Sequence, residues 1–178
     1  MLKKLWYAIL YRVAKLRYFL SRGNYEILNR YYRKCGVKIG KNCLICTPFH
    51  PNTDNVLLEI GDDTAVSVDV TFVLHDFSVS RIDRGTSSFY GKITIGKNCF
   101  IGARSVLMYG VEIADNVIVA AGSVVTKSVR ESNVIVGGNP ARVIGTWDKL
   151  GEKIEKYGTR HMSAKDVLEQ HPELLIQR

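Results

Sequence analysis

The sequence has few cysteines, few prolines and no apolar run near its start that could cross a membrane. Its 178 residues include four cysteines and four prolines. The apolar stretch Leu5–Leu10 is far shorter than the about 20 residues of a membrane-spanning helix. Basic residues interrupt the sequence after it and no small-residue cleavage site follows, so we expect neither a transmembrane helix nor a signal peptide. We therefore expect a cytoplasmic protein.

Aliphatic residues recur every six positions through the middle of the chain. A helix repeats its buried face every ~3.6 residues and a strand every two, so this period fits neither a packed helix nor an ordinary sheet. It predicts an all-β solenoid of short stacked strands. The positions are Ile39 and Ile45, then Ile60, Val66 and Phe72, then Ile95, Ile101, Leu107, Ile113, Val119 and Val125.

Two further columns of the hexad support the solenoid. Three residues after the aliphatic position stand residues that tolerate a left-handed backbone and can turn a corner: Asn42, Asp63, Asp69, Asn98, Asn116 and Gly122. One residue later stand small side chains, among them Cys43 and Cys99, which we interpret as core fillers. Cys43 and Cys46 have the spacing of half a zinc site, but no second pair completes it, so no metal is predicted.

The net charge of +8 is carried by the first 34 residues, where nine Lys or Arg accompany one acid, Glu26. Because the repeats carry no basic stripe, nucleic-acid binding is not expected. Apolar residues of this segment share one face of an amphipathic helix. This face could cover the open end of the solenoid, or residues 1–22 could lie on an anionic membrane surface. The face comprises Leu2, Leu5, Trp6, Ile9, Val13, Leu16 and Leu20.

Two segments interrupt the regular hexads. Residues 46–58 contain two prolines and are predicted to form a loop pushed out of the solenoid. Residues 77–91 form a longer excursion, and a loop of that length in a compact repeat is usually functional or disordered. It leaves directly after His75 and Asp76. His75 is the one histidine within a regular hexad, in the corner column, and is therefore our candidate for chemistry.

The run Val70–Asp76, the excursion and the hexads after it resemble the galactoside and maltose group of hexapeptide-repeat O-acetyltransferases. Among these, the sugar O-acetyltransferases of capsule and lipopolysaccharide assembly are most similar. Residues 120–127 and 137–145 resemble the coenzyme A elements of that group. The resemblance implies a left-handed parallel β-helix of about five triangular rungs over residues 37–145, assembled as a homotrimer. It is preceded by the basic helical segment 1–36 and followed by a segment 146–178 with short helices.

The resemblance implies acetyl transfer from acetyl-CoA to a hydroxyl of a sugar or glycan precursor. An imidazole is suited to accept the hydroxyl proton near neutral pH, so we expect His75 to be the general base. Asp76 is the nearest candidate to orient its ring, with a backbone carbonyl as the alternative. No acyl-enzyme is required.

The same resemblance assigns further site residues. Small residues at Ala103, Ala121 and Thr126 match positions beside the pantetheine arm, and Lys127 and Arg142 match positions near the nucleotide phosphates. In the excursion and beyond, a polyol could be bound by Arg81, Arg84 and Tyr109, with Asp83 and Tyr90 as further candidates.

Other functions remain open alternatives. Serine is a less favoured acceptor because the long helical N-terminal domain of serine acetyltransferases is missing; an aminosugar is a further alternative. A γ-class carbonic anhydrase would need three histidine zinc ligands, and only His75 lies in the hexads. A structural or ice-binding solenoid would show a flat column of threonine, which the sequence lacks. The basic N-terminal helix favours a lipid-carried glycan precursor at the inner membrane surface.

Overall fold

The computed structural model describes residues 2–159 and 161–176, with side chains from residue 5 onward. Leu2 of the predicted apolar face and the basic residues Lys3 and Lys4 are therefore outside the range whose side chains are described. The chain divides into two compact units, Met1–Ile144 and Gly145–Arg178. No helix in the described ranges is long and apolar enough to span a bilayer.

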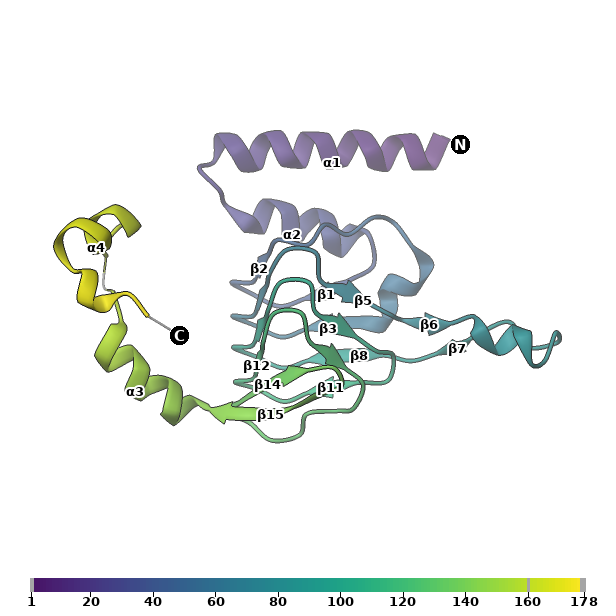
Figure 1. Cartoon of the computed structure of the whole chain (residues 1–178). Coiled ribbons are helices and arrows are strands. Elements are labelled where there is room, and N and C mark those ends of the chain that lie inside the picture. The colour runs from purple at the N-terminus through teal and green to yellow at the C-terminus, as the bar shows by residue number, and fades with distance from the viewer. Residues whose placement is uncertain (1, 160, 177–178) are drawn as a thin grey trace. The chain divides into compact units, whose positions relative to one another are not determined.

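Short strands of the first unit stack into three sheets that form the sides of a coil (Figure 1). The first sheet contains β1 (Lys38–Ile39), β3 (Leu58–Ile60), β8 (Ile93–Ile95) and β11 (Glu112–Ile113). The second contains β2 (Leu44–Ile45), β4 (Ala65–Val66), β9 (Phe100–Ile101), β12 (Ile118–Val119), β14 (Val134–Gly138) and β15 (Ala141–Thr146). The third contains β5 (Thr71–Phe72), β10 (Val106–Leu107) and β13 (Val124–Val125).

The register of these sheets follows the hexads. The two-residue strands pair in parallel, with Ile101 opposite Val119 and Leu107 opposite Val125, so one turn of the coil without an interruption takes 18 residues. The aliphatic column is buried, from 0% exposure at Ile45 to 8% at Ile39, except for the half-buried Phe72. The predicted period therefore identifies the core correctly, and parallel pairing satisfies the backbone of each short strand.

The corners use the residues that the second column predicts. Asn42, Asp63, Asp69, Asn98, Asn116 and Gly122 all have positive φ. The residue directly after the aliphatic position is small for a steric reason at Gly61, which follows Ile60, since an added Cβ would lie 2.6 Å from the Gly96 carbonyl carbon. Cys43 and Cys99 fill the core beside the corners at 3% exposure, and burial raises the pKa of both thiols.

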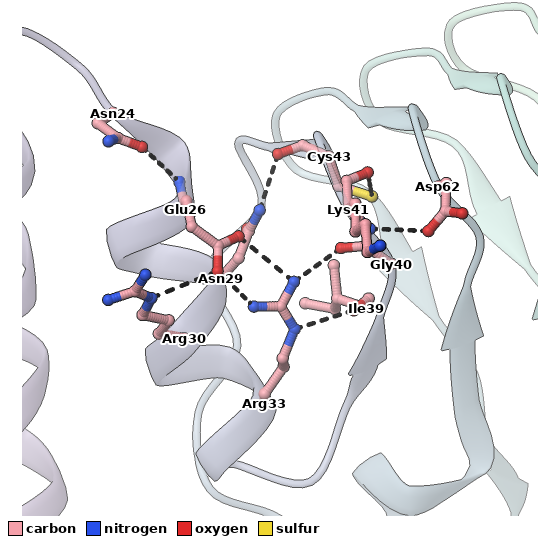
Figure 2. Close-up of polar contacts among 10 residues, drawn as sticks. All are labelled: Asn24, Glu26, Asn29, Arg30, Arg33, Ile39, Gly40, Lys41, Cys43 and Asp62. Carbon is pink, nitrogen blue, oxygen red and sulfur yellow. Dashed lines mark hydrogen bonds and ion pairs between the residues drawn. The ribbon is translucent and has the colours of Figure 1, made fainter.

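Helix α2 (Tyr25–Lys34), which follows α1 (Leu2–Leu20), closes the open end of the coil. Figure 2 shows how polar contacts attach it to the first coil. The buried Asn29 donates from Nδ2 to the Cys43 carbonyl at 2.8 Å, and Arg33 donates to the carbonyls of Ile39 and Gly40 at 2.9 and 2.7 Å. Arg33 also pairs with Glu26 at 2.8 Å, and this contact lowers the pKa of the Glu26 carboxyl.

The apolar stripe predicted on the first helix does not cover the coil. Leu5, Trp6, Ile9, Val13, Leu16 and Leu20 are between 46% and 70% exposed. The side of α1 that packs on the rest of the unit instead carries Ala14 and the partly buried Tyr7, Leu10, Tyr11 and Tyr18. The covering interpretation of the stripe is therefore wrong, because α2 occupies the end of the coil and α1 lies over α2 with its tyrosine side.

The second unit contains α3 (Trp147–Tyr157), α4 (Ala164–Gln170) and the 3-10 turn η3 (Pro172–Leu174). Both short helices expected from the sequence are present. Ser163 caps α4 by accepting from the Asp166 N–H at 3.2 Å, while Asp166 accepts from the Ser163 N–H at 2.9 Å.

Candidate active site

The first interruption replaces the third side of the first coil. Thr47 accepts from the Val70 N–H at 2.9 Å, and the ring of Phe49 stacks on that of Phe72 in β5, with centroids 5.7 Å apart. The loop then forms the 3-10 turn η1 (Thr53–Leu57). Asn55 anchors that turn, donating from Nδ2 to the carbonyls of Cys35 and His50 at 2.9 and 2.8 Å. These contacts fix Asp54 beside the third sheet.

The second interruption is an arm that extends from the coil (Figure 1). It begins two residues before the predicted excursion, with β6 (His75–Asp76), which pairs antiparallel with β7 (Phe89–Tyr90) and is followed by η2 (Ser78–Arg81). The Gly91 N–H donates to the Leu74 carbonyl at 3.1 Å and closes the base of the arm. His75 thus starts the arm and turns no corner, unlike the other members of its column.

The two interruptions meet at His75. Its Nδ1 lies 2.7 Å from Oδ2 of Asp54, with the aspartate side chain 15% and the histidine side chain 44% exposed. The other carboxylate oxygen of Asp54 accepts from the Thr53 hydroxyl at 3.1 Å. A carboxylate that accepts a hydrogen bond from Nδ1 favours the tautomer with the proton on Nδ1. The Nε2 lone pair is then free, and the contact restrains the ring. Tyr90 lies beside the imidazole, with ring centroids 5.8 Å apart.

Asp76, the predicted orienting partner, makes other contacts. Its carboxylate accepts from the Ser78 N–H at 2.8 Å and from the Tyr109 hydroxyl at 3.2 Å. Hydrogen bonds from Ser78 and then from Tyr109 lower the pKa of Asp76, whereas burial and the adjacent carboxylate raise the pKa of Tyr109. The carboxylate that contacts the His75 ring nitrogen in this structure is therefore that of Asp54 and not that of Asp76, which Ser78 in η2 and Tyr109 hold.

A groove of about 440 Å³ runs beside His75. Its walls come from the first interruption, including Asp54, and from the segment Val70–His75 that contains β5. The exposed imidazole therefore lies at the edge of a space that a small molecule can enter.

The residues predicted to bind the cofactor fall in two places. Lys127 and Arg142, both exposed, line one hollow of about 420 Å³, and Thr126 is exposed next to Lys127. Ala103 and Ala121 lie at the corner before β10 and β13, on successive coils, where the Gly122 N–H donates to the Ala103 carbonyl at 2.8 Å. In the described chain, Lys127 and Arg142 thus lie together. Ala103 and Ala121 lie at the opposite ends of β10 and β13.

The predicted acceptor residues are likewise divided. Tyr109 lies at the root of the arm through its hydrogen bond to Asp76. Arg81 and Arg84 are exposed beyond the β6–β7 ribbon, together with Asp83, whose carboxylate accepts from the Thr86 hydroxyl at 2.6 Å. They do not line the groove beside His75.

Asp54 is the site residue that sequence reasoning missed. It lies in a segment without hexad phase, so its position in space cannot be read from the repeat. One signal was present, since Asp54 is the only acidic residue of the interruption 46–58.

The comparisons with known proteins agree with this architecture. The hexapeptide repeat of succinyl-transferase matches residues 92–127. Protein CapG of Staphylococcus aureus is 36% identical over 138 residues, which cover 75% of this chain and 76% of CapG. The chain belongs to the hexapeptide-repeat transferase family.

Two further members of this family are similar. Galactoside O-acetyltransferase of Escherichia coli is 36% identical over 111 residues, covering 59% of this chain and 54% of that protein. A solved galactoside acetyltransferase in complex with coenzyme A has a TM-score of 0.52 and 27% identity, covering 72% of this chain and 62% of that one. The chain spans about half of the length of the first curated relatives that it matches.

Proposed function

We propose that the protein is an acetyl-CoA-dependent O-acetyltransferase that acts on a hydroxyl of a sugar or glycan precursor. The observation that carries the proposal is the His75–Asp54 pair at the edge of an open groove. The names of the similar proteins, two of them galactoside acetyltransferases and one solved with coenzyme A, support acetyl transfer to a sugar.

In the proposed reaction His75 Nε2 accepts the proton of the acceptor hydroxyl as its oxygen attacks the thioester carbonyl. The new C–O bond forms, the C–S bond breaks, and the same imidazolium returns the proton to the leaving thiolate. Asp54 keeps Nδ1 protonated and faces the imidazolium with a negative charge. Water competes with the acceptor at this exposed site, so acceptor binding must place its hydroxyl against Nε2.

Acetyl-CoA would be held by the groups that the resemblance assigns. Lys127 and Arg142 present two cations to one hollow, which suits the nucleotide phosphates of coenzyme A. The small corner residues Ala103 and Ala121 leave room for the pantetheine arm. The hydrogen bond between Asp76 and Tyr109 would position the base of the arm. Arg81 and Arg84, in the outer part of the arm, would contact the acceptor.

A homotrimer with a left-handed coil completes the proposal. The two groups of predicted cofactor residues lie at opposite ends of β10 and β13, and a site between neighbouring subunits would unite such groups. The cytoplasmic location stays a prediction from the sequence.

Release of the coenzyme A thiol, measured over a panel of sugars, glycan precursors, aminosugars and serine, tests the function. We expect acceptor-dependent thiol release with sugar hydroxyls. Transfer to an amine or to serine alone would replace the acceptor assignment, and the absence of transfer with every acceptor would contradict the proposal. Light scattering of the purified protein checks the trimer independently.

A further inference from the structure

Helix α1 carries an apolar face that no other described residue covers. Leu5, Ile9, Val13, Leu16 and Leu20 follow one another at helical spacing and so share one side of the 19-residue helix. Trp6 and Phe19 flank them, at 59% and 79% exposure. We call these seven residues the outer face. Since Tyr7, Tyr11, Ala14 and Tyr18 pack on the other side, α1 has two apolar faces and the fold uses only one.

The outer face has basic margins. At about 100° per residue, Arg12 lies along one edge of the outer face and Arg17 along the other. Lys15 lies beyond Arg12, with its Nζ 5.6 Å from the centroid of the Tyr11 ring. All three are exposed. No Asp or Glu occurs before Glu26, so no carboxylate of this helix neutralises these cations. An apolar strip with cations on both of its margins is the pattern of a helix that lies in a membrane interface.

The geometry points to an anionic membrane surface as the partner of the outer face. In Figure 1, α1 is the outermost layer at its end of the coil and lies across that end, over α2. The helix can therefore lie flat, with its aliphatic side chains among the acyl chains and Trp6 at the headgroup level. Arg12, Lys15 and Arg17 would extend along the apolar surface to reach lipid phosphates.

Charge disfavours a second copy of α1 as the partner. Two outer faces packed together would bring the cationic margins of both helices close to each other. No acidic side chain of either helix lies between them, so the like charges would repel. An anionic membrane surface removes this repulsion, because its lipid phosphates would lie against the basic margins of the outer face.

Vesicle flotation of the full chain tests the inference. We expect binding to vesicles of phosphatidylcholine with phosphatidylglycerol, weaker binding to phosphatidylcholine alone, and a blue shift of tryptophan emission on binding. The double variant Ile9→Glu, Leu16→Glu places two charges on the outer face and should weaken binding at least about tenfold. Lys15→Gln with Arg17→Gln should weaken binding to anionic vesicles about 25-fold, since each basic residue contributes about fivefold.

The matched control is Ile154→Glu with Leu168→Glu. These residues have the same side chains, lie in α3 and α4, and are 58% and 64% exposed, so the control should float like the unmodified protein. Circular dichroism checks that each variant folds. Three results would overturn the inference. They are no flotation of the unmodified protein, equal binding by the Ile9→Glu, Leu16→Glu variant, and equal binding to both vesicle types. Concentration-dependent self-association in lipid-free buffer that the same variant abolishes would assign the face to a second copy instead.

Discussion

Replacing Asp54 by asparagine tests how the candidate base is held. The asparagine side chain has the same shape, but its amide can donate to Nδ1 and so stabilise the tautomer that lacks a free Nε2 lone pair. Hydrogen bonds to charged groups contribute about 1.5–3 kcal/mol. Because the His75 side chain is 44% exposed, solvent weakens the contact and the lower part of that range applies. At about 1.4 kcal/mol per factor of ten, Asp54→Asn should lower kcat about 10- to 30-fold.

The assay is acceptor-dependent thiol release, with kcat and KM measured separately. The KM for acetyl-CoA should not change, because Asp54 lies away from the hollow that contains Lys127 and Arg142. Introducing Asp54→Asn into a His75→Ala background should cost nothing further, because the two residues act as one unit. The comparison variant is Asp76→Asn, which leaves the His75–Asp54 contact intact and should lower kcat less than Asp54→Asn does.

Full activity of the Asp54→Asn variant would refute this reasoning. An equal loss in the presence and absence of His75 would refute it too, since the effect would then not pass through the imidazole. A greater loss in Asp76→Asn than in Asp54→Asn would restore Asp76 as the orienting group.

Three further predictions concern the cofactor, acid stability and the core. Arg142→Ala should raise the Kd for acetyl-CoA at least about tenfold by calorimetry, whereas Arg104→Ala, which removes another exposed arginine, should not; equal effects would remove Arg142 from the site. Glu26 has a lowered pKa, so its contribution to stability is complete above its unfolded value of about 4.3 and is lost as pH falls through the folded value. Glu26→Gln should therefore lower Tm at pH 7 but not at about pH 2, and a pH-independent change would contradict the pairing. Leu107→Ala should lower the free energy of unfolding by about 2–5 kcal/mol in urea titrations, because Leu107 is fully buried; a loss under about 1 kcal/mol would contradict its place in the core.

The regular part of the fold could be predicted from the sequence because the hexad states which residues face inward. Ile95, Ile101 and Leu107 fix the register, and each coil repeats the same constraint, so small errors do not accumulate. Asn98 and Asn116 mark corners for the same reason, since few residues adopt positive φ there.

The site was less predictable because it lies where the repeat stops. His75 could be found from the excursion that follows it. Asp54 could not, since its position depends on the Phe49–Phe72 stack and the Asn55 anchors, contacts that no period encodes. The packing side of α1 was misassigned for a related reason. Tyrosines can pack as well as aliphatic residues, and an apolar stripe does not state which surface it covers.

The role of His75 is measured directly by acetyl transfer with the unmodified protein and with His75→Ala, and with acetyl-CoA binding followed in parallel. We predict that kcat falls by about 10²–10⁴ while the affinity for acetyl-CoA and the oligomeric state do not change. A His75→Ala variant that transfers acetyl groups at a near-normal rate would contradict it.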